Sequence, residues 1–91
     1  MYSDQDKVNL EIRKRRLLYQ ANHRGTYEAD LLVGRYVSYY LESMNAEQLD
    51  ELERILLLDD VDLTSWLTGA KPIPKHLDTM GMLLSIKKFA Q

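Results

Sequence analysis

The residues best suited to chemistry lie in the pentapeptide Arg24-Gly25-Thr26-Tyr27-Glu28. The pentapeptide combines a forked cation with a carboxylate four positions later, and its glycine leaves the backbone bare where a chain turns or another molecule approaches. The two charged groups could form an i,i+4 ion pair at a helix junction, worth about 0.3–0.5 kcal/mol. Equally, they could form a recognition patch that pairs with a partner chain, and tyrosine and arginine are both enriched at interface hot spots.

Groups that could act in catalysis are poorly arranged elsewhere in the chain. The five serines lie in none of the contexts in which a base, itself held by a third group, activates a nucleophile. His23 and His76 are far apart and share no metal-ligand spacing with carboxylates. The four glycines are scattered, so the chain has neither a phosphate-binding loop nor a dinucleotide fingerprint. We therefore expect no enzymatic activity, no catalytic residue and no metal site.

The acidic run Asp59-Asp60-Val61-Asp62 could suggest a Ca²⁺ site. It lacks the glycine at loop position six and the glutamate at position twelve that an EF-hand requires. We expect Asp60 or Asp62 to cap a helix, within a solvated acidic corner.

The basic run Arg13-Lys14-Arg15-Arg16 belongs to a cationic N-terminal part of the chain. Residues 1–25 carry six cations and three anions, whereas residues 26–91 carry six cations and eleven anions. This asymmetry admits a nucleic acid, an acidic protein surface or the chain's own acidic half as its partner. Four consecutive residues span about 400° of a helix, so they cannot share one strip. A solvated helix side with one or two internally paired residues is the favoured interpretation.

The elements that must position these groups are predicted to be helices. Prolines occur only at positions 72 and 74, and strict apolar alternation is missing. The chain is therefore expected to be all-α, a compact single-domain bundle of about five short helices over residues 1–91, with residues 1–6 as a flexible N-terminus. The first predicted helix starts after Asp4 or Asp6 and ends at about residue 22, and the second covers about 26–42, with Thr26 as its candidate N-cap. The third begins after a capping box at Asn45, the fourth covers about 63–67 and ends at Gly69, and the fifth covers about 75–89.

The predicted buried faces follow from helical periodicity. Trp66 is expected to fill the core, and Gly34 to allow close helix packing. The expected inward residues are Val8, Ile12, Tyr19 and Leu18, with Leu10 or Leu17, in the first helix; Leu31, Leu32, Val37, Tyr40 and Leu41 in the second; Leu49, Leu52, Ile55 and Leu56 in the third; and Leu77, Met80, Leu83, Leu84 and Phe89 in the last.

Four segments together carry a family resemblance. They are Arg15-Arg16-Leu17-Leu18-Tyr19, Arg24-Gly25-x-x-Glu28, Asp30-Leu31-Leu32-x-Gly34 and Asp60-x-Asp62-Leu63-x-x-Trp66-Leu67-Thr68-Gly69. At this spacing in a chain of 91 residues, they resemble the small RGxxE family, from about residue 13 to the C-terminal helix. That family comprises the bacterial SdhE-type flavinylation factors and the mitochondrial succinate dehydrogenase assembly factor 2 proteins.

The resemblance implies a five-helix bundle that binds the flavoprotein subunit of succinate dehydrogenase or, in some bacteria, of fumarate reductase. Such proteins promote covalent attachment of FAD to a histidine of that subunit, so the cofactor belongs to the partner and none is expected to stay bound here. Arg24, Gly25 and Glu28 match the motif that meets the flavoprotein, and Tyr27, Asp30 and Arg16 are predicted neighbours in the same partner-binding site.

Further expectations concern compartment and partners. The N-terminal residues lack the features of a signal peptide, and no apolar run approaches the roughly 20 residues that span a bilayer. We expect a monomer without membrane insertion or a nucleic-acid partner, in the bacterial cytoplasm or, for a eukaryotic protein, the mitochondrial matrix. The alternative is a regulatory binding module, either nucleic-acid-binding or antitoxin-like.

Overall fold

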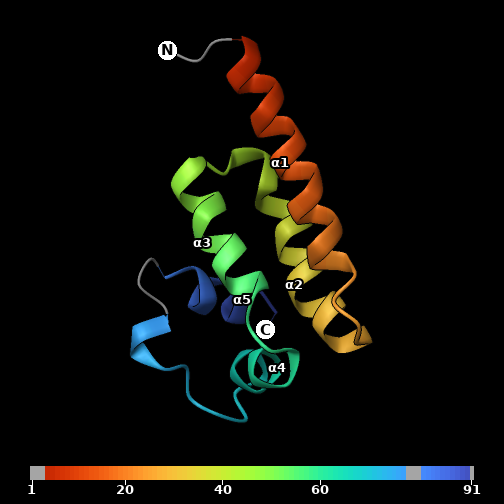
Figure 1. Ribbon diagram of the computed structural model, residues 1–91. Coiled ribbons are helices and arrows are strands. Elements are labelled where there is room, and N and C mark those ends of the chain that lie inside the picture. Colours follow the sequence, from red (N-terminus) through yellow and green to blue (C-terminus); the bar gives the residue numbers. More distant parts are fainter. Residues whose placement is uncertain (1–3, 78–80, 91) are drawn as a thin grey trace.

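The computed structural model describes residues 4–77 and 81–90 as an arrangement of helices without any strand in those ranges (Figure 1). The predicted all-α bundle of about five helices is confirmed. The α-helices are α1 (Asp4–Asn22), α2 (Tyr27–Tyr40), α3 (Ala46–Leu56), α4 (Asp60–Thr68) and α5 (Met82–Ala90), and two single 3₁₀ turns are η1 (Leu41–Ser43) and η2 (Lys75–Leu77).

The structure differs from the predicted helix boundaries near both ends of the chain. Residues 1–3 of the expected flexible N-terminus lie outside the described residues, and the backbone of residues 4–6 is helical. The single helix predicted for about residues 75–89 is wrong, because η2 is separate and α5 begins only at Met82, directly after Gly81. Gly81 has a φ of +79°, which a helix interior does not allow. Met80, predicted to face inward, lies outside the described residues.

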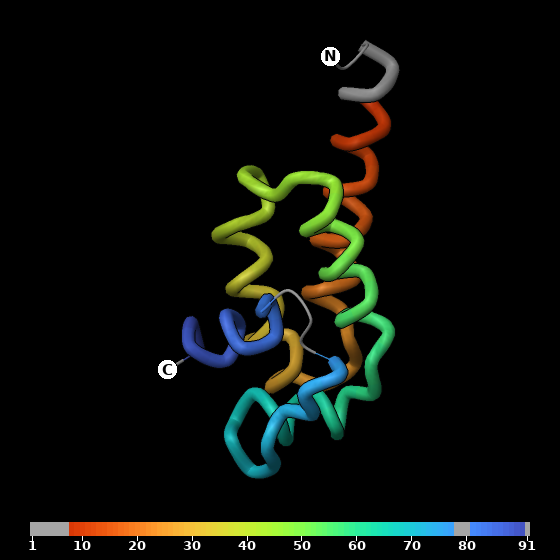
Figure 2. The backbone as a smooth tube through the Cα atoms, turned by 90° about the vertical axis from the view of Figure 1, so that its left-hand side faces the viewer, coloured from red at the N-terminus to blue at the C-terminus, as the bar shows by residue number. Residues whose placement is uncertain are grey.

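The helices pack around one core, with α1 running along α2 and α3, while α4 and α5 close the lower part of the molecule (Figures 1 and 2). In both views the N-terminal part of α1 projects beyond the other helices. None of the described helices has the length and apolar character needed to cross a membrane. The buried core consists of Leu17, Ala21, Val33, Val37, Leu41, Met44, Leu49, Leu52, Ile55, Leu63, Leu67, Met82, Leu83 and Ile86.

The buried face of α1 is only partly the predicted one. Leu17 is buried, and Leu10 and Leu18 pack partly against the core, as expected. Val8, Ile12 and Tyr19 were also expected inside but remain 53%, 48% and 65% exposed, and the second buried residue is Ala21. At about 100° per residue, these three exposed residues lie within about 40° of one another, and the two buried residues lie about 140–180° from Ile12. The helix therefore carries apolar residues on two sides, and the packing of α2 and α3 buries only one.

The other faces were predicted with mixed success. The third-helix residues Leu49, Leu52 and Ile55 are buried as expected, and Leu56 packs partly against the core. Trp66 is only partly buried, so the prediction of a core plug is wrong. The prediction also fails for four residues that stay about 40% exposed, namely Leu31, Tyr40, Leu84 and Phe89.

Local helix ends follow the sequence closely. Thr26 caps α2 by accepting a hydrogen bond from the backbone N–H of Ala29 at 3.2 Å. Asn45 and Gln48 form the predicted capping box of α3, and Gly69 ends α4 with a φ of +84°. The N-cap of α4 is Asp59, not Asp60 or Asp62 as predicted, because the side chain of Asp60 is engaged elsewhere.

Gly34 allows α1 and α2 to pack closely, as expected. A Cβ atom there would meet the Asn22 side chain and would lie 3.4 Å from the backbone carbonyl oxygen of Ala21. The Asn22 side chain is itself held, because its Nδ2 donates to the Leu18 carbonyl at 2.9 Å. A larger residue at position 34 must therefore displace the Asn22 side chain from its hydrogen bond or separate the two helices.

We predict that Gly34→Leu lowers the free energy of unfolding by about 1–3 kcal/mol, because overpacking forces the helices apart. Urea unfolding followed by circular dichroism measures this change. The matched control is Arg35→Leu on the exposed side of the same helix, expected to stay within about 0.5 kcal/mol. Equal stability of the two variants would contradict the proposed contact.

Candidate functional site

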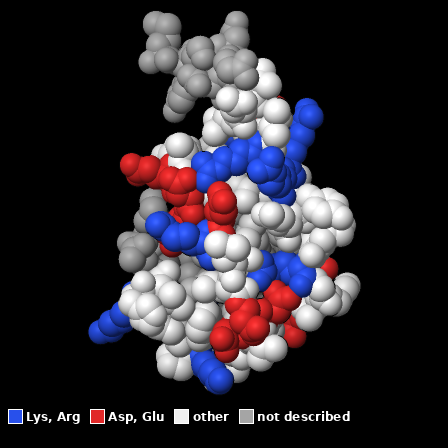
Figure 3. All heavy atoms as spheres, viewed as in Figure 1, with Lys and Arg blue, Asp and Glu red and all other residues white. Residues whose placement is uncertain are grey.

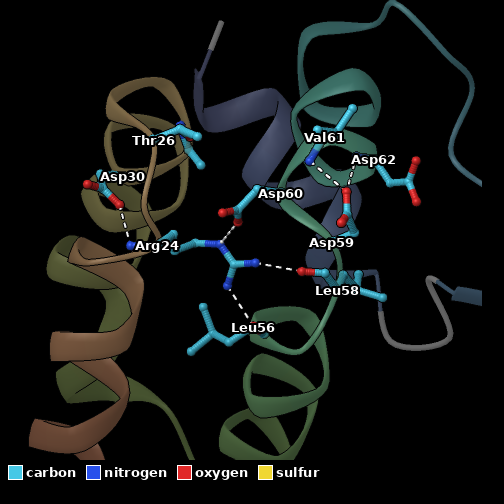
Figure 4. Close-up of polar contacts among 10 residues, drawn as sticks. Arg24, Thr26, Asp30, Leu56, Leu58, Asp59, Asp60, Val61 and Asp62 are labelled. Carbon is cyan, nitrogen blue, oxygen red and sulfur yellow. Dashed lines mark hydrogen bonds and ion pairs between the residues drawn. The ribbon is translucent and has the colours of Figure 1, made fainter.

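The Arg24 side chain joins the α1–α2 turn to the connection between α3 and α4 (Figure 4). Its Nε donates to Asp60 Oδ1 at 2.7 Å, and its two terminal nitrogens donate to the backbone carbonyls of Leu56 and Leu58, each at 2.7 Å. The side chain is 6% exposed, and that of Asp60 is 25% exposed. All three guanidinium nitrogens thus contact a segment more than 30 positions away.

The chemistry of these acceptors explains why an arginine is used. The last carbonyls of an α-helix have no intrahelical partner and carry partial negative charge, and Leu56 is the last residue of α3. A planar guanidinium can donate to this carbonyl, to that of Leu58 in the following connection and to a carboxylate at once, which a lysine ammonium cannot do with the same geometry. Arg24 is therefore the residue that fixes the turn on the bundle.

The backbone of the turn is fixed as well. The Arg24 N–H donates to Asp30 Oδ1 at 2.6 Å, across the first turn of α2. Gly25 adopts a φ of +106°, a conformation that strongly favours glycine. A Cβ atom on Gly25 would lie 3.8 Å from Asp60 Oδ2, so the constraint at this position is conformational and not steric.

Three residues of the predicted site point outward from this turn. Gly25, Tyr27 and Glu28 are exposed, and Tyr27 is exposed to 81%. Among the residues that the structure describes, Glu28 forms no ion pair. The interpretation as an i,i+4 ion pair is therefore wrong, because Arg24 pairs with Asp60 instead. The turn presents a bare glycine, a phenol and a carboxylate on a rigid support.

The remaining predicted site residues have different positions. Arg24 and Asp30 hold the turn from inside, and Arg16 lies exposed on α1, beside the same region. Their proposed contact with a partner stays a prediction. Sequence reasoning missed the roles of Asp60 and of the Leu56 and Leu58 carbonyls. A signal for Asp60 was present, because its segment accompanies the RGxxE segment in the family resemblance.

The basic run of α1 is partly used within the chain, as expected. Arg13 forms ion pairs with Asp50 at 2.6 Å and Glu53 at 2.8 Å, and these hydrogen bonds raise the pKa of its guanidinium above the ordinary value. Lys14 donates to the carbonyl of Glu42 at 2.9 Å. Arg15 and Arg16 form no ion pair with any residue in the described ranges.

The acidic run has a structural role in two of its positions. Asp59 accepts hydrogen bonds from the N–H groups of Val61 and Asp62, and Asp60 holds Arg24 (Figure 4). Within residues 8–77 and 81–90, whose side chains the structure describes, no three histidine or acidic side chains are grouped so that they could hold a metal ion.

A small all-α bundle with exposed side chains on a rigid turn has the architecture of a helical binding module. The chain belongs to the family described as flavinator of succinate dehydrogenase, whose family model matches residues 15–90. The resemblance identified from the sequence is thereby confirmed.

Curated relatives carry matching names. The FAD assembly factor SdhE of Acetobacter pasteurianus is 46% identical over 71 residues, which cover 78% of this chain and 65% of that protein. The mitochondrial succinate dehydrogenase assembly factor 2-B of Drosophila ananassae is 43% identical over 77 residues, covering 82% of this chain and 47% of that protein. This chain thus spans about half to two-thirds of the length of these relatives.

Proposed function

We propose that this chain is an assembly factor that binds the flavoprotein subunit of succinate dehydrogenase and promotes covalent attachment of FAD to a histidine of that subunit. Membership of the flavinator family supports this role. The observation that carries the proposal is the anchored turn, in which Arg24 holds Gly25 and Glu28 of the RGxxE motif on the bundle surface.

The mechanism requires no acid, base or nucleophile from this chain. The flavin and its acceptor histidine carry the reaction, and both belong to the partner. A helper protein can accelerate such a step by holding the partner so that histidine and flavin approach reacting distance. The chain is accordingly not an enzyme on its own, and it binds no flavin stably. It acts as a clamp on the flavoprotein.

The turn supplies the contact surface of this clamp. Gly25 lets the partner backbone approach, and Tyr27 and Glu28 contact the partner directly. Arg24 and Asp30 act from inside by keeping the turn in one conformation. A rigid surface loses less conformational entropy on binding than a mobile loop does, and the buried hydrogen bonds of Arg24 supply this rigidity.

The flavoprotein subunit of fumarate reductase is proposed as a second binding partner. The chain acts as a monomer, in the bacterial cytoplasm or the mitochondrial matrix. A nucleic-acid partner is disfavoured because Arg13 and Lys14 are engaged internally, which leaves two cations of the basic run for phosphate contacts.

A pull-down tests the proposed partner. The tagged chain, expressed in cells that make succinate dehydrogenase, is expected to capture the flavoprotein subunit, identified by mass spectrometry, in a form poor in covalent FAD. An equally tagged Glu28→Lys variant should capture much less, because it reverses the charge of an exposed motif residue. Absence of the flavoprotein subunit from the captured proteins would refute the proposal.

A further inference from the structure

A surface groove lies between α1 and the segment from the end of α3 to the start of α4. Its volume is about 910 Å³, and its lining includes Ile12, Arg16, Tyr19, Leu57, Arg24 and Asp60. Figure 3 shows this face, with charged atoms gathered between α1 and α3 and again at the start of α4, and uncharged surface between them. Two of the lining residues, Arg24 and Asp60, form the ion pair that anchors the turn, so the groove opens beside the RGxxE turn.

Three large apolar side chains stay exposed in the walls of the groove, among its charged residues. Ile12 and Tyr19 belong to the side of α1 that faces away from the core, and Leu57, directly after α3, is 82% exposed. Exposed apolar side chains along a hollow offer another chain apolar area to cover on binding. Tyr19 adds a rigid aromatic ring, which stacks on His23 with ring centroids 4.0 Å apart.

The charges of the groove are almost all neutralised within the chain. Arg13 pairs with Glu53, and Arg24 pairs with Asp60. Asp59 accepts hydrogen bonds from two backbone N–H groups of α4. Arg16 is the only lining arginine without an ion-pair partner among the described residues. Arg16 is therefore the guanidinium of the lining that a carboxylate of a partner can pair with, in the same groove as the exposed side chains of Tyr19 and Leu57.

We infer that the groove receives a segment of the flavoprotein partner that places an apolar side chain between Tyr19 and Leu57 and a carboxylate on Arg16. This inference rests on the proposed function, and it extends the contact surface from the turn along α1. Continuity favours the same partner, since Asp60 lines the groove and also lies beneath Gly25. A carboxylate is favoured because it would pair with Arg16, the one arginine of the lining that has no ion-pair partner among the described residues.

Binding of the purified chain to the purified flavoprotein subunit tests the groove by calorimetry. Leu57→Ser and Arg16→Glu are each expected to weaken binding about tenfold or more, as loss of an interface anchor does. The matched controls are Val61→Ser, an exposed apolar residue of α4, and Arg15→Glu, the neighbouring cation, both outside the groove lining. They should change the affinity less than about threefold. All four positions are exposed, so thermal unfolding midpoints should stay close to that of the original chain.

The outcomes separate this inference from the proposed function. If the original chain fails to bind the subunit, the proposed function fails. If it binds and the groove variants match the controls, the groove inference alone is overturned. A dimer of the chain that Leu57→Ser converts to monomers in sedimentation would assign the groove to a second copy and would also overturn it.

A photo-crosslinking residue at Gln20, which lines the groove, tests the chemistry of the occupant. Mass spectrometry of the crosslinked complex should identify a flavoprotein peptide in which an apolar residue lies within a few positions of an aspartate or glutamate. A crosslinked peptide without any carboxylate side chain would contradict the assigned role of Arg16.

Discussion

Replacing Arg24 with methionine is expected to lower the free energy of unfolding by about 2–4 kcal/mol, somewhat less than the loss of one partner of a fully buried ion pair costs, because Asp60 stays partly exposed. The change leaves Asp60 without its cation and the carbonyls of Leu56 and Leu58 without their donors. Domains of this size have a total stability of about 5–15 kcal/mol, so the variant should lose a large share of it. Urea unfolding monitored by circular dichroism measures the loss.

Two further variants separate the causes. Arg15→Met removes an exposed arginine without an ion pair in the described residues and should change stability by less than about 0.5 kcal/mol. Arg24→Lys keeps the charge but loses the planar fork, so its stability should lie between those of the original chain and Arg24→Met. If Arg24→Met proved as stable as Arg15→Met, the anchor would be disproved and Arg24 would be free to contact a partner directly.

Replacing Gly25 with arginine is expected to abolish covalent flavin in a co-expressed flavoprotein subunit while the fold persists. The side chain would protrude from the surface that we propose meets the partner. The φ of +106° adds backbone strain of about 1–3 kcal/mol for a residue with a Cβ atom. Because a Cβ atom there would make only an ordinary contact with Asp60, the bundle itself should remain folded. In-gel flavin fluorescence measures the effect, and circular dichroism checks the fold.

The control for strain is Gly81→Arg. Gly81 also has a positive φ, +79°, and a Cβ atom there would meet nothing within 4 Å. This variant should lose comparable stability but retain flavin attachment, since Gly81 precedes α5 and is no part of the turn. With Gly25→Ala, the flavoprotein subunit should lose less covalent flavin than with Gly25→Arg, because alanine protrudes less although the backbone strain is similar. Full flavin attachment with Gly25→Arg would contradict the docking role of the motif.

The sequence predicted features whose partners lie within one helical turn. The Thr26 cap, the Asn45–Gln48 capping box and the Gly69 helix end each depend on residues three or four positions apart. Residue type and local spacing are sufficient to identify such ends. The existence of the helices was therefore predictable, and most of their boundaries fell within a few residues.

Long-range partners were not predictable in the same way. Arg24 and Asp60 are 36 positions apart, and both had satisfactory local explanations as an i,i+4 ion pair and a helix cap. The prediction for the buried face of α1 was wrong for Val8, Ile12 and Tyr19 for a related reason. The helix has apolar residues on two sides, and only the placement of α2 and α3 decides that Leu17 and Ala21 are buried while Ile12 and Tyr19 stay exposed.

The central claim is that this chain promotes flavin attachment through its anchored RGxxE turn. The most direct measurement is the covalently bound FAD of the succinate dehydrogenase flavoprotein subunit, made with this chain, without it, or with Gly25→Arg. We predict a high flavin content only with the original chain, and low, similar contents in the other two samples. Equal flavin content in all three samples would contradict the claim.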